Sequence, residues 1–154
     1  MSSLFYFCMY YFFNMPKKIL KFDFTSEIDF AIIAVVCSLK DYRLCFELNT
    51  ALKLNLKREK DKEFLDRNHN RSLFTSFFYK SKDQEEIRVV VNKGTVFSFI
   101  PEKKNIDYFM TIKHMSAVSQ ENFIEQVKNI SSISGVYELE HAELKSAENF
   151  LVFD

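Results

Sequence analysis

The sequence has few residues that interrupt regular structure, and it lacks the motifs of common enzyme classes. Its 154 residues include two glycines, two prolines and no tryptophan. Two glycines are too few for the glycine-rich loops that hold phosphate groups in nucleotide-binding proteins. Neither a G-x-S-x-G nor an H-E-x-x-H motif is present, so the signatures of α/β-hydrolases and zinc peptidases are missing. No catalytic residue and no cofactor are therefore predicted, although the absence of motifs does not exclude an enzyme.

Cysteine and histidine are also scarce, and their spacing does not suggest a metal site. The cysteines are odd in number and none forms a C-x-x-C pair, a pattern typical of free thiols in a reducing compartment. The histidines are far apart in the sequence. The residues concerned are Cys8, Cys37, Cys45, His69, His114 and His141. We expect a cytoplasmic protein without a metal centre.

The charges balance overall but are unevenly distributed. Residues 1–115 carry 19 Lys and Arg against 14 Asp and Glu, whereas residues 116–154 carry 2 against 7. A net charge of zero provides no general attraction to nucleic acids or membranes. Two interpretations are open: the acidic part folds against the basic part, or it forms a separate acidic surface for a partner.

The N-terminus contains the longest apolar run, Leu4–Phe13, with the sequence LFYFCMYYFF. Ten residues are too few for a membrane-spanning helix, which needs about 20. No basic residue precedes the run, so it does not fit a signal peptide. Either it contacts a partner or membrane interface, or translation starts at Met15 and residues 1–14 are not native. The regular pattern that begins after Met15 favours the second interpretation and a single domain over residues 15–154.

Apolar spacing in the first half predicts strands and one helix. Residues alternate over Lys18–Phe24, as in a half-buried strand, and Phe30–Cys37 is a continuous apolar run. We interpret this run as a central strand, with a helix capped by Ser26 as the alternative. A helix should then begin with Ser38 as its cap and end near Asn55.

The second half predicts an antiparallel arrangement. Strands are expected over 72–80, 87–91, 95–100 and 106–113, with a hairpin loop at 92–94 in which Gly94 supplies a positive φ. Ser119 should cap a helix to about Ile130, followed by a short strand over 136–139 and an amphipathic tail. The predicted fold class is α+β, with a mainly antiparallel sheet and two main helices packed on one face.

One segment has a specific resemblance. Residues 100–109 read IPEKKNIDYF, in which I-P-E, a three-residue spacer and a D-Y pair occur around Ile106. The chain resembles the bacterial IPExxxVDY family of uncharacterised proteins, with isoleucine in place of the valine. The resemblance extends from about Met15 to near the C-terminus and agrees with Met15 as the start. It implies family membership but no activity.

Within this segment, Pro101, Glu102, Asp107 and Tyr108 are candidate binding residues. Glu102 and Asp107 could act as paired carboxylates that bind a cation or work as acid and base. The alternative, which we favour, is structural: Pro101 ends a strand, Glu102 forms a local salt bridge, Asp107 accepts backbone amides and Tyr108 packs.

Two other groups of residues are candidates for binding. Tyr42 and Arg43, in the first turn of the expected helix, could clamp a ligand or form a local ion pair. Strand aromatics could stack single-stranded bases, although core packing is the more common role of such residues. They are Phe77, Phe78, Tyr79, Phe97 and Phe99.

Together these patterns favour a protein-interaction module without catalytic activity, and they allow a homodimer formed through a sheet edge. A small-ligand site or enzyme using Glu102 and Asp107 is the first alternative. Single-stranded nucleic-acid binding is the second, and neither nucleic acid nor membrane is the expected partner.

Overall fold

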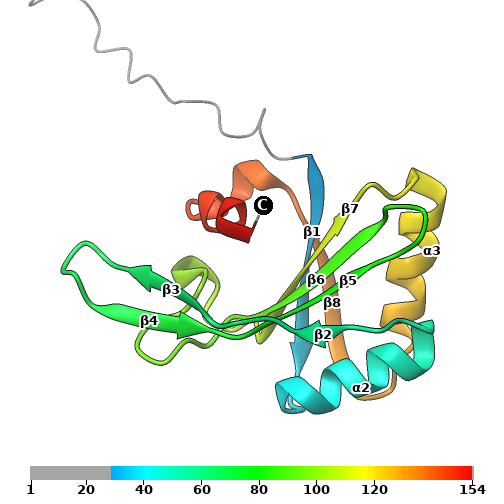
Figure 1. Ribbon diagram of the computed structural model, residues 1–154, viewed down its shortest axis with the longest axis horizontal. Coiled ribbons are helices and arrows are strands. Elements are labelled where there is room, and N and C mark those ends of the chain that lie inside the picture. The colour runs from blue at the N-terminus through cyan, green and yellow to red at the C-terminus, as the bar shows by residue number, and fades with distance from the viewer. Residues whose placement is uncertain (1–28, 154) are drawn as a thin grey trace, which may run out of the picture.

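The computed structural model describes residues 29–153, and its centre is one antiparallel sheet (Figure 1). The predicted strand over 18–24 and the interpretation of residues 1–14 lie outside the described residues. Six strands follow the order β2-β5-β6-β7-β1-β8, and every neighbouring pair is antiparallel. The strands are β1 (Phe30–Cys37), β2 (Lys57–Arg58), β5 (Ser76–Lys80), β6 (Glu86–Val91), β7 (Tyr108–Lys113) and β8 (Ile133–Leu139). The α+β prediction is confirmed.

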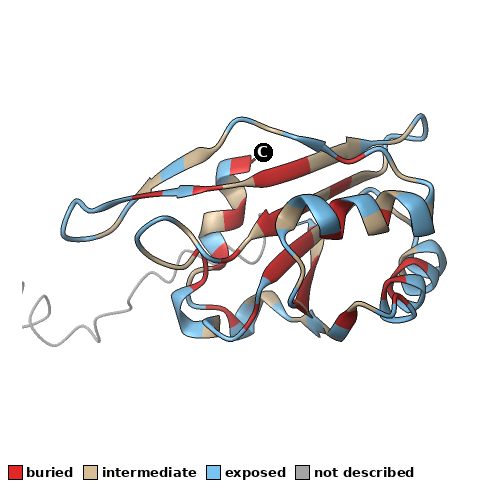
Figure 2. Cartoon of the chain, turned by 90° about the horizontal axis from the view of Figure 1, so that it is seen from below, coloured by how far each residue is buried: buried red, intermediate tan, exposed pale blue. Residues whose placement is uncertain are grey.

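Two helices cover one face of the sheet, as the sequence predicts. They are α2 (Asp41–Leu52) and α3 (Ala117–Lys128), and each turns its buried residues toward the strands and its exposed residues outward (Figure 2). Leu44 and Leu48 of α2 pack with Ile124 and Val127 of α3 against the central strands. The continuous apolar run of β1 is explained by its central position, because it is covered on both faces.

The C-terminal segment covers the opposite face. It contains the short 3-10 helices η3 (His141–Glu143) and η4 (Ala147–Phe153). Phe150 packs edge-to-face against Phe99 and Phe109 and is 2% exposed. The amphipathic tail expected from the sequence therefore completes a second core.

A two-stranded ribbon, β3 (Lys62–Leu65) and β4 (Arg71–Phe74), projects from one end of the sheet (Figure 1). The expected strand over 72–80 is divided at Thr75, because β4 pairs with β3 whereas β5 pairs with β6. The residues 72–80 therefore contribute strands to two different sheets.

The two helix caps differ from the prediction. The residue before α2 is Lys40, not Ser38, and its side chain makes no capping bond. Ser116 caps α3, because its Oγ accepts the Ser119 amide at 3.2 Å, so the cap lies one turn earlier than expected. Lys53, with φ of 54°, ends α2 in place of Asn55.

The expected hairpin around Gly94 is also wrong. Residues 95–100 form no strand, and only an isolated bridge joins Lys93 to Ser98. Neither described glycine has a positive φ. A Cβ at Gly94 would lie 2.2 Å from Ser72 Oγ and 2.4 Å from Phe97 O, so close packing requires this glycine.

Gly94→Ala is therefore expected to destabilise the fold by about 1–3 kcal/mol, the usual cost of overpacking. Gly135→Ala is the matched control, because its Cβ would meet only the movable, 56% exposed Tyr137 ring, at 3.0 Å. Urea unfolding of both variants measures the difference. Equal losses would show that close approach at Gly94 is not the constraint.

Candidate functional site

The I-P-E…D-Y segment forms a compact connection into β7. Pro101 opens the 3-10 helix η2 (Pro101–Lys103), as expected of a residue without an amide donor. Ile100, Ile106 and Tyr108 are buried, whereas Glu102 and Asp107 are exposed. The buried residues of the motif anchor the segment. Ile100 and Ile106 belong to the core under the tail, and Tyr108 belongs to the core under the helices.

Asn92 holds this connection together, although the sequence suggested only a turn residue. Its Nδ2 donates to the carbonyls of Lys103 and Ile106 at 2.9 and 2.8 Å. Its Oδ1 accepts the Ile100 amide at 2.9 Å, and the side chain is 1% exposed. An amide that both donates and accepts is needed here, and the residues it bonds lie 8 to 14 positions away.

Glu102 bonds to the C-terminal segment. Its carboxylate accepts the Ser146 amide at 2.7 Å and the Ser146 hydroxyl at 3.0 Å. Partial burial opposes ionisation, but the hydrogen bonds from its own amide and from Ser146 and Lys145 together lower the pKa of Glu102. Glu102 is therefore a stable anion that joins η2 to the tail.

Asp107 bonds instead to the end of β1. Its Oδ2 accepts the Cys37 amide at 2.9 Å, and its own amide donates to Val35 O at 3.2 Å. The two candidate carboxylates thus have different bonding partners, Glu102 in the tail and Asp107 in β1. Asp107 accepts a backbone amide, as the structural interpretation expects, whereas Glu102 bonds to Ser146, 44 positions away, and not to a local ion-pair partner.

A shallow groove of about 460 Å³ lies beside Asp107. Glu102 does not line it, so the groove does not contain both carboxylates. Its polar lining consists mainly of Ser38, Asn92, Lys93, Ser98, Lys104 and Asp107. No cluster of three or more metal-ligating side chains occurs among residues 29–153.

The buried titratable groups Tyr108 and Cys37, which line the groove, and Cys45, which does not, are poorly suited to acid–base or nucleophilic chemistry. Burial, and then the charge of Asp41, raises the pKa of Tyr108, whose hydroxyl donates to Leu39 O. Burial also raises the pKa of Cys37, and it raises that of Cys45 to about 12. Since the reactive form of cysteine is the thiolate, both thiols are unreactive near neutral pH.

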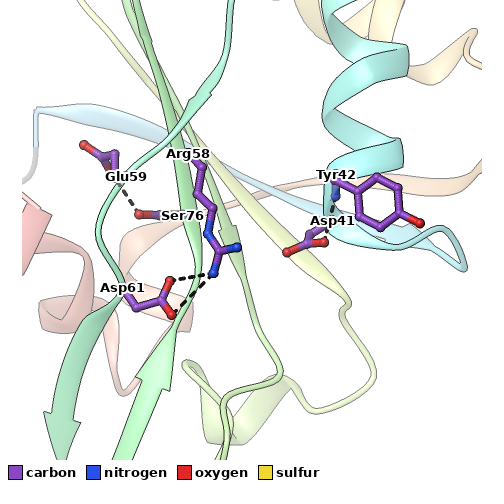
Figure 3. Close-up of polar contacts among 6 residues, drawn as sticks. All are labelled: Asp41, Tyr42, Arg58, Glu59, Asp61 and Ser76. Carbon is purple, nitrogen blue, oxygen red and sulfur yellow. Dashed lines mark hydrogen bonds and ion pairs between the residues drawn. The ribbon is translucent and has the colours of Figure 1, made fainter.

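Tyr42 and Arg43 are exposed in the first turn of α2. Tyr42 is 61% exposed, and its amide bonds to the Asp41 carboxylate at 2.7 Å (Figure 3). Neither residue lines the groove beside Asp107. The structure therefore does not bring them together with the I-P-E…D-Y candidates.

A charged cluster near β2 connects the sheet to the tail. Glu59 accepts the Ser76 hydroxyl at 2.9 Å, whereas the neighbouring Arg58 pairs with Asp61 (Figure 3). Glu59 also pairs with Arg88 at 3.2 Å. Arg88 in turn lies over the rings of Phe78 and Phe153, at 4.6 and 5.0 Å from their centres.

The strand aromatics do not share one face. Phe77 and Tyr79 belong to the core under the helices, whereas Phe97 and Phe99 belong to the core under the tail. Phe78 lies under the Arg88 guanidinium. These rings are buried or half-buried, and most of their area packs inside the molecule.

The two edge strands of the sheet differ in length and in charge. At one edge, β2 has only two residues, Lys57 and Arg58, and short basic strands are a common protection against edge pairing. At the other edge, β8 has seven residues, ISGVYEL, without lysine, arginine or proline. Within residues 29–153, no strand lies beyond β8. This edge can therefore accept an additional strand.

The backbone direction of β1 shows which β8 groups point outward. Val35 O accepts the Asp107 amide, so the backbone groups of Val35 face β7. Neighbouring residues of a strand direct their N–H and C=O groups to opposite sides. Ala34 and Val36 therefore face β8, and the contact of Phe30 O with His141, at 2.7 Å, agrees with this alternation.

The pairing of β1 with β8 shows which β8 residues direct their backbone groups toward β1. Tyr137 is opposite Ala34 and Gly135 is opposite Val36, so the backbone groups of these two β8 residues face β1. Those of Val136 and Glu138 point to the outer edge. The side chains of Tyr137 and Glu138 are exposed as well. The sequence indicated only the second half of this strand and not its edge position.

An exposed hollow with both polar and apolar lining residues lies between α2 and α3, near the start of β8. It has a volume of about 520 Å³ and is lined in part by Phe46, Leu52 and Ile130. Phe46 is 70% exposed, a large apolar area for a side chain on a helix surface. Three residues after Ile130, the chain enters β8.

Comparison with known proteins does not assign the chain to a family. No family model matches the sequence, and no curated protein matches it either. Membership of the IPExxxVDY family therefore remains a prediction based on the motif. None of the helices among residues 29–153 is long and apolar enough to cross a bilayer.

Proposed function

We propose that this chain is a protein-interaction module that binds an extended segment of a partner as an additional strand on β8. The observation that carries this proposal is the seven-residue outer edge of β8, which contains no lysine, arginine or proline. Strand addition derives affinity from main-chain hydrogen bonds and selectivity from side-chain contacts. The backbone groups of Val136 and Glu138 provide the hydrogen bonds, and Tyr137 provides an exposed aromatic contact.

Other features support the same proposal. The exposed Phe46, which lines the hollow between the helices, adds an apolar side chain to the surface near the start of β8. The I-P-E…D-Y segment is occupied with internal bonds from Asn92, Glu102 and Asp107. The buried free thiols Cys37 and Cys45 support a reducing compartment such as the cytoplasm.

Proline substitution at Glu138 provides a direct test. Glu138→Pro removes an outward amide but leaves the inward bonds of Tyr137 to β1, so the fold should survive while strand addition fails. A photo-crosslinking amino acid placed at Tyr137 in cells is expected to give a discrete adduct, which Glu138→Pro abolishes. Glu138→Gln, which keeps the amide, should retain the adduct.

Tyr42 is the matched control position, because it is also an exposed aromatic, 61% against 56% for Tyr137. A crosslinker at Tyr42 should give no adduct that depends on Glu138. Thermal unfolding of Glu138→Pro verifies that the variant is folded. An adduct at Tyr137 that persists in folded Glu138→Pro would contradict strand addition.

A further inference from the structure

The charges around the outer edge of β8 indicate the chemistry of a segment that would pair with it. Residues 116–154, which contain α3, β8 and the tail, carry 2 Lys against 7 Asp and Glu. On the helix side, α3 packs against β8 and exposes Glu121 and Glu125, with Lys128 in its last turn. Glu138 is the one formal charge of β8 itself and is exposed. Acidic residues therefore outnumber basic ones in the segments that adjoin β8 in the sequence and in the helix that packs against it.

The two faces of an added strand would meet different surfaces. Glu138 is opposite Ile33, whose side chain lies in the core under the helices, so Glu138 is on the helix side. Tyr137 and Leu139 are opposite Ala34 and Ile32, which lie in the core under the tail. Side chains of an added strand alternate in the same way. One face would contact Glu138 and the half-buried Val136, and the other would contact Tyr137 and Leu139.

We propose that the partner segment is an extended strand in which basic and apolar residues alternate. This inference rests on the proposed function and specifies its ligand class. Basic side chains would lie on the helix side, within cross-strand distance of Glu138, and apolar side chains would pack beside Tyr137 and Leu139. The Tyr137 ring lies over Gly135, within 3.0 Å of where a Cβ of that residue would be, and provides the aromatic part of this surface.

A second copy of the chain fits this edge less well. Antiparallel pairing of two β8 strands would place two acidic regions side by side, each with the same charges. Like charges close together across a sheet are destabilising. A basic strand would instead be attracted by these acidic residues, and the attraction would also accelerate its association at low salt.

The test uses the purified full chain and two acetylated, amidated peptides, KVKVKVK and EVEVEVE, titrated calorimetrically at low salt. We expect KVKVKVK to bind at least about tenfold more tightly than EVEVEVE. Glu138→Gln should weaken KVKVKVK binding about twofold to fivefold, as expected for the loss of one exposed ion pair. Glu138→Pro should abolish binding of both peptides.

The outcomes separate the two proposals. Loss of binding in Glu138→Pro together with equal or tighter binding of EVEVEVE would overturn the basic-partner inference but leave strand addition intact. Binding of KVKVKVK that Glu138→Pro does not affect would overturn strand addition at β8. A dimer of the chain alone, detected by sedimentation and lost in Glu138→Pro, would make a second copy the occupant. Absence of binding by either peptide would also overturn the inference, and the Tyr137 crosslink would then decide on the function.

Discussion

Replacing Phe150 by alanine is expected to lower the free energy of unfolding by about 3–5 kcal/mol, the usual cost of removing a buried aromatic side chain. Phe150 is 2% exposed and lies at the centre of the core under the tail. Its ring packs within 5.0 to 6.2 Å, centre to centre, of the rings of Phe30, Phe99 and Phe109. Alanine would leave a cavity between the sheet and the tail that the neighbouring rings could fill only partly.

Val152→Ala is the matched control, because Val152 lies in the same 3-10 helix but is 49% exposed. Its substitution should change stability by less than about 0.5 kcal/mol, as is usual at surface positions. Urea unfolding followed by circular dichroism measures both variants. A small loss in Phe150→Ala, similar to that in Val152→Ala, would show that the tail does not contribute to the core in solution.

Asn92→Ala is expected to destabilise the protein by about 3–5 kcal/mol, because it leaves up to three backbone groups without their partner and each buried one costs about 1–3 kcal/mol. The groups are the carbonyls of Lys103 and Ile106 and the amide of Ile100. Since a domain is stabilised by only about 5–15 kcal/mol, this variant should be close to unfolding at physiological temperature.

Asn105→Ala tests whether this effect depends on the bonds of Asn92. Asn105 is an exposed asparagine in the same connection, and its substitution should have little effect. Differential scanning calorimetry measures the melting temperatures of both variants. Equal shifts would indicate that the connection tolerates loss of the Asn92 network.

Much of the fold could be predicted from local patterns. Burial determines both the apolar run Phe30–Cys37 and the helical spacing of Leu44 and Leu48. The strand and the helix predicted from these patterns are confirmed. The helix caps were less predictable, because Ser38 and Ser119 are plausible caps by sequence but do not occupy the cap positions. The choice of Ser116 depends on the path by which the chain leaves β7.

The predictions around residues 92–100 failed for a physical reason. Asn, Lys and Gly in sequence are typical of a hairpin loop, but the Asn92 side chain bonds groups as far away as Ile106. Gly94 is needed because Ser72 and Phe97, distant along the chain, approach its Cα. Neither constraint is local, so periodicity and turn propensity could not reveal it.

In the candidate site, too, the sequence revealed the residues but not their contacts with distant parts of the chain. The motif residues Glu102, Asp107 and Tyr108 were identified from their order, but spacing alone could not show that Glu102 meets Ser146 and Asp107 meets Cys37. The sequence indicated the end of β8 as a strand and a homodimer through an edge as a possibility. That β8 is the longer edge strand among residues 29–153 depends on the order in which distant strands pair.

By itself, the amino-acid sequence determined the α+β class, the central strand, the two helices and the separation of acidic from basic regions, because periodicity and charge are properties of neighbouring residues. The tertiary structure decided how the motif carboxylates are bonded, why Gly94 is required and which strands form the edges of the sheet within residues 29–153. Each of these depends on pairs of residues far apart in the chain, and their meeting is determined by the packing of the whole domain.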